Sequence, residues 1–299
     1  METSLYISSK AIQMVRGTEK GGRVNIDSFV TVPLPEETMI NGVVTNEAAF
    51  KEAMEKILTA CPDSKMDGLR ITVGGTPVFT KVKVIPNMKE EQVLTWMRGE
   101  FPELDGETEE MIFDYALLES GDEGSRALLC AIKKSIIEEM VRLFDEIGQK
   151  ISCINVDICS QIKFIHNMTE TEGRNFILIY ADGQDISASL YINGVFRLFN
   201  RARTLAERMS EAMIDEVEQA VSRMTQFSYS EFRDEKIEFI YVLGLEDVYE
   251  ASKAGTLPPI RGDVELRDLG TDAADMVKAE DIRFNVEDYM IAAGNLIRE

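Results

Sequence analysis

The chain has 299 residues, of which 44% are hydrophobic and 28% are charged. This balance is typical of a globular protein, the length allows two domains, and the composition excludes a disordered chain. The 53 acidic residues outnumber the 32 lysines and arginines, so the formal net charge is −21. Nucleic acid is therefore not an expected partner, and an anionic membrane surface would repel the chain unless another protein held it there.

Cysteine and histidine are scarce. The four cysteines, Cys61, Cys130, Cys153 and Cys159, form no C-x-x-C pair, and His166 is the only histidine. The sequence thus predicts no metal site and no disulfide framework, and reduced thiols favour the cytoplasm. The N-terminus has no signal peptide, and no apolar stretch approaches the length of a membrane span, so we expect a soluble protein.

The first half of the chain opens with short apolar runs separated by turn residues, which is the pattern of a hairpin meander. Asn46 is a candidate cap for a helix over 47–60. Apolar residues at helical spacing predict further helices over 89–100, 135–147 and 159–168. The expected strands are 5–7, 11–15, 24–30, 69–73, a pair over 78–80 and 82–86, then 111–118, 127–132 and 151–156.

The second half repeats this plan. Asn193-Gly194 is a strong two-residue hairpin turn inside a second meander. A long helix is predicted over 204–225, with Leu205 and Met209 on its apolar stripe. The other expected elements are strands over 176–181, 186–192, 195–199, 238–243 and 264–269, and helices over 247–253 and 286–298. Repetition of a whole supersecondary unit indicates a duplicated architecture.

Several motifs then give the chain a family likeness. They are the Pro-containing strand end Val84–Glu91, the segments Phe113-Asp114-Tyr115 and Ala131–Lys134, the stretch from Gly148 to Asp157, and Ala292-Ala293-Gly294 in the closing helix. In this order and spacing they resemble the PilM family of type IV pilus assembly proteins, relatives of the cell-division protein FtsA. The resemblance implies an α/β (mixed α+β), actin-like (ribonuclease H-like) duplicated fold with an inserted subdomain of the 1C type.

The resemblance also implies a division into two actin-like domains. The first would cover residues 1–170, with its core in 1–70 and 151–170 and the 1C-like subdomain in 71–150. The second would cover 171–299. The polar stretch around residues 169–174 suits a boundary between them.

Actin-like ATPases carry a phosphate loop in each half, where aspartates handle metal and water and glycines let backbone N–H groups approach the phosphates. By resemblance, Tyr6 and Tyr180 stand at the two aspartate positions. The other degenerate positions of the nucleotide cleft are Ser8, Ser9, Gln13, Asp182, Gly183 and Gly244. Because both acidic groups are lost, we expect no ATPase activity, no catalytic residue, and neither ATP nor magnesium as a cofactor.

The leading hypothesis is a non-catalytic cytoplasmic scaffold of a type IV pilus or related secretion machine. The resemblance implies binding of the short N-terminal tail of an inner-membrane partner, PilN, together with contacts to other pilus assembly proteins. Val82, Val84, Met88 and Trp96 are the expected lining of the tail-binding site. Two alternatives stay open: an active ATP-binding ATPase of the same fold, and the cytoplasmic domain of a type II secretion protein of the GspL kind.

Overall fold

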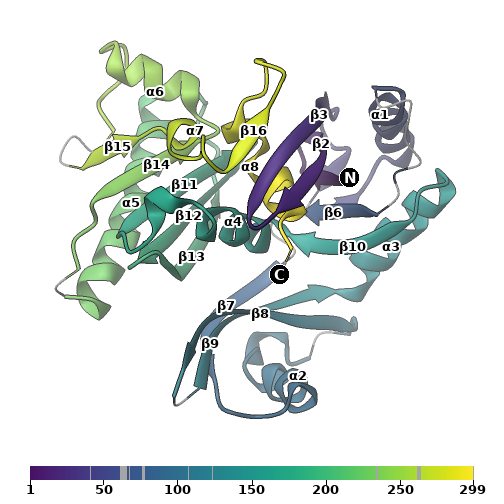
Figure 1. The fold of residues 1–299 in the computed structure, drawn as a ribbon, viewed down its shortest axis with the longest axis horizontal. Coiled ribbons are helices and arrows are strands. Elements are labelled where there is room, and N and C mark those ends of the chain that lie inside the picture. Colours follow the sequence, from purple (N-terminus) through teal and green to yellow (C-terminus); the bar gives the residue numbers. More distant parts are fainter. Residues whose placement is uncertain are drawn as a thin grey trace. The chain divides into compact units, whose positions relative to one another are not determined.

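The computed structural model describes residues 1–40, 42–60, 66, 68–75, 78–106, 108–122, 124–233, 235–260 and 264–298, so Cys61 lies outside the described residues. The chain divides into two compact units. Unit 1 contains Met1, Val15–Phe29 and Ser160–Glu299. Unit 2 contains Glu2–Met14 and Val30–Cys159. Figure 1 labels most of the helices and strands and colours the chain from the N-terminus to the C-terminus.

Unit 2 is built around parallel strands. β1 (Glu2–Ile7) and β10 (Ile151–Val156) both pair in parallel with β6 (Leu69–Val73), which lies between them. The helices α1 (Glu47–Ala60) and α3 (Lys134–Glu146) bury their apolar faces in one core with these strands. The short strands β4 (Met39–Ile40) and β5 (Val43–Val44) pair with each other before α1.

The start of α1 confirms the predicted cap, because the Asn46 Oδ1 accepts a hydrogen bond of 3.1 Å from the Ala49 N–H. The amide oxygen thus satisfies one of the free N–H groups at the start of the helix.

A second sheet in unit 2 has the order β7-β9-β8 and is antiparallel throughout. Its strands are β7 (Val78–Ile85), β8 (Met111–Gly121) and β9 (Gly124–Lys133), and α2 (Glu90–Gly99) covers one face (Figure 1). The expected strand pair over 78–80 and 82–86 is wrong, since β7 is one continuous strand. Lys81 stays in register opposite Leu129 at the point where a turn was expected.

Unit 1 contains the turn end of a hairpin, Val15–Phe29, and a five-stranded sheet. The hairpin joins β2 (Ala11–Lys20) to β3 (Arg23–Pro33), and β16 (Val277–Ala279) pairs in parallel with β3. The five-stranded sheet has the order β13-β12-β11-β14-β15. Its strands are β11 (Phe176–Asp182), β12 (Asp185–Ile192), β13 (Val195–Arg203), β14 (Phe239–Leu243) and β15 (Glu265–Arg267).

The helices α5 (Glu211–Glu231) and α6 (Glu246–Lys253) contribute to one core with this sheet. The helix α4 (Asp157–His166) contacts the same sheet through Gln161, whose Nε2 donates to the Ser189 hydroxyl (2.6 Å). Between β12 and β13, Asn193 and Gly194 both have positive φ angles of 54° and 73°. This geometry confirms the predicted two-residue turn, since such turns need left-handed residues.

The predicted helix over 204–225 is wrong at its start. The helix begins at Glu211 because the Ser210 hydroxyl accepts a hydrogen bond from the Met213 N–H (3.3 Å) and so caps it. Leu205 and Met209 precede the helix and are 87% and 52% exposed, so they do not belong to an apolar stripe.

The predicted strand over 264–269 ends early, at Arg267. The Asp268 Oδ1 accepts a hydrogen bond from the Thr271 N–H (2.6 Å) and starts the short helix α7 (Leu269–Asp272). The last helix is α8 (Val286–Leu296). Among the described helices, none is long and apolar enough to cross a membrane.

Candidate functional site

The first expected phosphate loop is the turn between β1 and β2, in unit 2. Buried Ser8 closes this turn, since its hydroxyl accepts hydrogen bonds from the N–H groups of Lys10 (3.2 Å) and Ala11 (3.3 Å). The Ser8 N–H in turn donates to the Ala11 carbonyl (3.1 Å). Ser9 is exposed. The backbone donors that a phosphate loop offers to its ligand are here engaged by the serine side chain.

Tyr6 is the residue predicted at the first aspartate position. It is 2% exposed and lies on β1 opposite Thr72 of β6. A Cβ atom on Gly74 would come within 2.6 Å of the Tyr6 hydroxyl, so the phenol ring lies against the backbone that follows β6. Gln13, another predicted position of the nucleotide cleft, is half-buried on β2, and its Oε1 makes no hydrogen bond to a described residue.

The second expected loop is the turn between β11 and β12, in unit 1. Gly183 has a φ angle of 62°, and Asp182 lies opposite Asp185 across the turn. Tyr180 faces Ser187, whose hydroxyl donates to the Tyr180 carbonyl (3.1 Å). The residue predicted at the aspartate position of this half is therefore also aromatic, and Asp182, two residues further on, adds negative charge.

Gly244 ends β14 beside the same hairpin. A Cβ atom there would lie 2.0 Å from the Ala181 carbonyl oxygen, and the φ angle is 73°, so only glycine fits. Because β14 pairs in parallel with β11, Tyr180 and Leu243 are neighbours in register, and Gly244 follows directly. The structure thus brings together the four predicted positions of the second half, namely Tyr180, Asp182, Gly183 and Gly244.

A carboxylate near the first loop was not predicted as a site residue. Asp157 follows β10 directly, opens α4, and is 4% exposed. Its Oδ2 accepts the Gly75 N–H (3.4 Å) and its Oδ1 accepts the Ile158 N–H (2.8 Å). An aspartate placed between a strand and a helix is the sequence signal that could have identified it. In the described ranges, no group of three or more histidine, cysteine, aspartate or glutamate residues could hold a metal ion.

The predicted partner-binding residues divide over the two faces of the three-stranded sheet. Met88 and Trp96 pack, half-buried, against the core under α2. Val82 and Val84 lie opposite Leu128 and Arg126 of β9, and these positions point to the other side of the sheet, away from α2. We call this second side the open face.

The open face is apolar and partly exposed. Its centre is formed by β9 residues that are almost fully buried, Leu128, Cys130 and Ile132. A hydrogen bond with Cys159, and then burial, raise the pKa of the Cys130 thiol, so this thiol stays protonated at neutral pH. The outer strands add Val84, which is 50% exposed, and Ile112, which is 38% exposed. The apolar surface that is open to solvent is therefore at the margins of this face.

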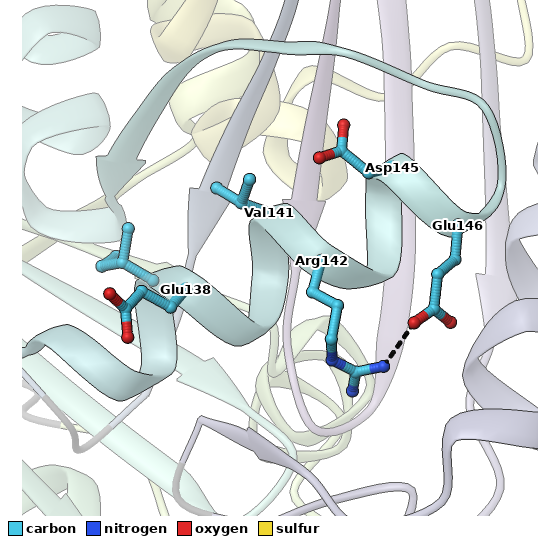
Figure 2. A pocket seen from close by; sticks show the side chains of 6 residues that line it. Glu138, Val141, Arg142, Asp145 and Glu146 are labelled. Atoms are coloured by element: carbon cyan, nitrogen blue, oxygen red, sulfur yellow. Dashed lines mark hydrogen bonds and ion pairs between the residues drawn. The ribbon is translucent and has the colours of Figure 1, made fainter.

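A different exposed apolar surface lies on α3. Val141 is 40% exposed and, with Ile137, lines a shallow hollow of about 560 Å³ (Figure 2). Every lining residue comes from α3, and the others are charged: Glu138, Arg142, Asp145 and Glu146.

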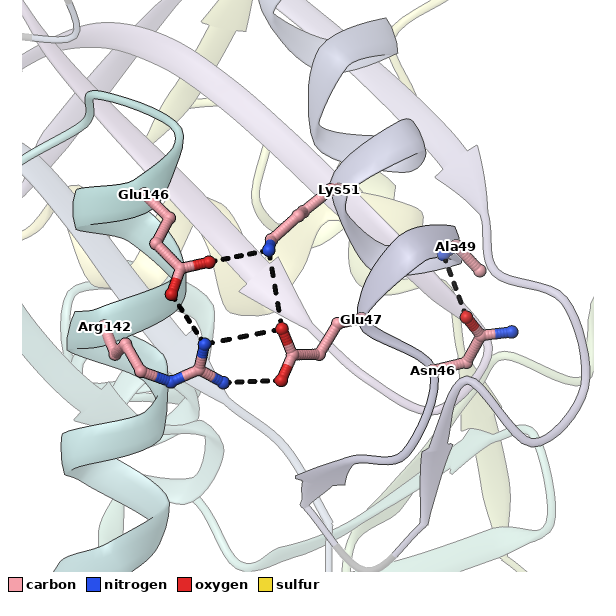
Figure 3. A network of polar contacts seen from close by, with 6 residues as sticks. All are labelled: Asn46, Glu47, Ala49, Lys51, Arg142 and Glu146. Atoms are coloured by element: carbon pink, nitrogen blue, oxygen red, sulfur yellow. Dashed lines mark hydrogen bonds and ion pairs between the residues drawn. The ribbon is translucent and has the colours of Figure 1, made fainter.

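The charges beside this hollow are already paired. Arg142 donates to Glu47 (2.7 Å) and to Glu146 (2.7 Å), and Lys51 donates to Glu146 (2.6 Å), so four side chains join α1 to α3 (Figure 3). Hydrogen bonds from Arg142 and Lys51 hold the pKa of the Glu47 carboxyl below its usual range. This arrangement is accounted for by the packing of two helices.

Residues 4–189 match the model of the family described as type IV pilus assembly protein PilM. The chain belongs to the PilM family. The match spans both hairpin turns and the three-stranded sheet with its open face. No match was found among curated protein sequences.

Solved structures show the fold of this PilM-family chain. A PilM–PilN type IV pilus biogenesis complex matches with a TM-score of 0.72 at 15% identity, covering 99% of this chain and 97% of that chain. A Bacteroides thetaiotaomicron protein with an actin-like ATPase fold and unknown function gives 0.55 at 12% identity, over 97% and 95% of the two chains. The cytoplasmic domain of EpsL, an inner-membrane component of the Vibrio cholerae type II secretion system, gives 0.52 at 9% identity, over 99% and 95%.

These likenesses confirm the mixed α/β, actin-like fold that the repeated hairpins predicted for this PilM-family chain. The two predicted phosphate loops correspond to the hairpin turns β1–β2 and β11–β12. Tyr6 and Tyr180 are thus placed on the strands that lead into those two turns.

Proposed function

We propose that this PilM-family chain is a non-catalytic scaffold of a type IV pilus assembly machine, located in the cytoplasm. It would bind the N-terminal tail of a PilN-like protein of the inner membrane and so be held at the membrane surface. The family and the likeness to the PilM–PilN complex support the assembly role. Tail binding is supported by the exposed apolar margin of the open face along β7.

The geometry of β7 suits the capture of an extended tail. Within the described residues β7 pairs only with β9, so its outer edge can accept another strand by backbone hydrogen bonds. Val82 and Val84 would then meet alternate side chains of the tail. The edge strand on the other side, β8, is less suited because its register shifts between Leu117 and Glu119, and a bulge interrupts pairing.

The test is calorimetric titration with a synthetic peptide of the PilN-like tail. We expect Val84→Asp to raise the Kd about tenfold or more, because the tail would have to cover a charged side chain in place of an apolar one. The matched control is Val141→Asp on α3, a valine of similar exposure in the same unit. Equal affinities for the two variants would rule out the β7 margin as the binding surface.

The non-catalytic part of the proposal rests on Tyr6 and Tyr180, which provide no carboxylate for magnesium. Asp182 adds repulsion toward phosphate. Titration of the same protein with magnesium and ATP should give no binding heat under conditions where the peptide binds. Magnesium-dependent ATP binding would overturn the loss of the nucleotide site and leave the tail-binding proposal to be judged by its own titration.

A further inference from the structure

A basic hollow lies in unit 1, between the β2–β3 turn and β16. It has a volume of about 560 Å³ and is lined by three cations, Lys20, Arg23 and Lys278, together with Gly21, Asn25, Asp275 and Met276. All three cations are exposed, and none of them forms an ion pair with a residue that the structure describes. The chain as a whole has a net charge of −21, whereas this hollow has three cations and one acid and so is locally positive.

Backbone pairing gathers these cations on one side of three strands. The Gly21-Gly22 turn, with φ angles of 59° and 78°, places Lys20 directly across from Arg23. Arg23 and Asn25 point to the same side of β3, while Val24 between them is fully buried. Lys278 lies level with Asn25 on β16. The charges are therefore held on a defined sheet surface even though they come from opposite ends of the chain.

The Gly21-Gly22 turn, which lies between Lys20 and Arg23, is held by contacts with neighbouring residues. The Gly22 N–H donates to the Glu19 carboxylate (2.8 Å), and a Cβ atom on Gly22 would lie 2.0 Å from the Asn167 Oδ1. The one acid of the hollow, Asp275, accepts a hydrogen bond from the Thr169 hydroxyl (3.2 Å). Among the described residues, neither Glu19 nor Asp275 forms an ion pair with Lys20, Arg23 or Lys278. The charge of these three cations is therefore available to a ligand.

We propose that the basic hollow binds an extended acidic segment of another protein. Neighbouring strands set side chains about 5 Å apart, and alternate residues along a strand about 7 Å apart. Lys278, level with Asn25, is a diagonal neighbour of Arg23 at about 7–8 Å, which is close to the spacing of alternate carboxylates in an extended peptide. The Gly22 N–H is engaged by Glu19, so this turn does not offer its backbone as phosphate loops do. An anionic bilayer fits poorly because the rest of the chain is acidic.

The probe is a fluorescently labelled peptide of alternating Glu and Ser, followed by fluorescence anisotropy. Work at about 0.1 M salt screens charges beyond about 10 Å, so the hollow itself is tested rather than the distant acidic surface. The variant is Lys20→Glu, Arg23→Glu and Lys278→Glu together, and we expect the Kd to rise at least about tenfold. Affinity of the unmodified protein should fall further as salt increases.

The matched control is Arg223→Glu, Arg233→Glu and Lys236→Glu, three exposed cations of the same unit. Each triple variant changes the charge by three times −2, from −21 to −27, so both have the same net charge. Equal loss of peptide binding in the two variants would overturn the proposal, as would the absence of binding to the unmodified protein. If the first variant fails to fold, the corresponding triple Gln variant is expected to lose binding too.

Two further experiments distinguish an acidic peptide from the other possible anionic ligands. Displacement of the peptide by inorganic phosphate at equal concentration would assign the hollow to a phosphate group instead. Binding to phosphatidylglycerol vesicles, lost in the Lys20, Arg23 and Lys278 variant, would assign it to a membrane. Neither result is expected. The inference is independent of tail binding at β7, because the hollow lies in unit 1 and the tail peptide should bind the hollow variant with unchanged affinity.

Discussion

Replacing Gly294 with alanine should lower the free energy of unfolding by about 2–3 kcal/mol. Gly294 is in α8, and a Cβ atom there would lie 2.1 Å from the Ser160 carbonyl oxygen and 3.1 Å from the Phe164 Cβ, both on α4. A backbone oxygen cannot move aside as a flexible side chain can, so the two helices would have to separate. The neighbouring residues Ala293 and Asn295 are fully buried, and the shift would disturb a packed core.

The matched control is Gly99→Ala, at the end of α2. Nothing lies within 4 Å of a Cβ atom at Gly99, and its φ angle is ordinary. Alanine there should be neutral or stabilise by up to about 1 kcal/mol, because it restricts the unfolded chain and favours helix. Urea unfolding followed by circular dichroism compares both variants with the parent protein. If the Gly294 variant were as stable as the Gly99 variant, α4 and α8 would not approach each other as described.

Much of the fold was accessible from the sequence because its signals are local. Asn193-Gly194 predicts its hairpin since both residues tolerate positive φ, and Asn46 predicts the start of α1 since its side chain can accept a backbone N–H. The apolar stripe of α3 was predicted over 135–147, within one residue of its observed bounds at each end. In each of these cases a few neighbouring residues decide the outcome.

Other features differ from the prediction, one because a local cap overrides apolar spacing and the others because they depend on partners distant in sequence. Leu205 and Met209 continue the apolar spacing of α5 toward the N-terminus, yet the helix starts only after the Ser210 cap, at Glu211. β16 has only three residues, too few for a period, and exists by pairing with β3. Sequence spacing also could not reveal that Val82 and Trp96 lie on opposite sides of a sheet, or that Lys278 joins Lys20 in one hollow.

The contact of Tyr6 with Gly74 shows the same limit at the candidate site. The family resemblance predicts Tyr6 at an aspartate position, but only the packing shows that its ring lies against Gly74, which follows β6. A side chain at residue 74 and the ring of Tyr6 therefore exclude each other.

The second large effect concerns pH and Glu287, in the first turn of α8. The Glu287 carboxylate accepts hydrogen bonds from the N–H groups of Leu269 (3.1 Å) and Gly270 (3.3 Å). Burial, then the negative charges of Asp268 and Glu246, raise the pKa of this carboxyl from its ordinary value of 4.5 to about 7, against the lowering effect of those two N–H groups. The folded protein thus holds a proton that the unfolded chain releases.

A raised pKa gives stability that is complete below the unfolded value and is lost as the pH rises through the folded one. The loss therefore falls between pH 4.5 and about 7 for Glu287. Glu287→Gln removes the charge and keeps an amide oxygen for the two N–H groups. Because the side chain is still partly exposed, solvent reduces the full effect, and we expect the variant to be more stable than the parent by about 1–2 kcal/mol near pH 8. Near pH 4.5 the two should be alike.

Urea unfolding at both pH values measures this difference. The matched control is Glu211→Gln, which removes one charge from an exposed acid in the first turn of α5. A gain at high pH shared by both variants would reflect relief of the overall negative charge, which also opposes compaction. A gain confined to Glu287→Gln shows that burial, together with the negative charges of Asp268 and Glu246, disfavours the charged form of Glu287. Since Glu246 also accepts the Gly244 N–H (2.7 Å), its charge lies beside the end of β14, next to the second hairpin turn of the candidate site.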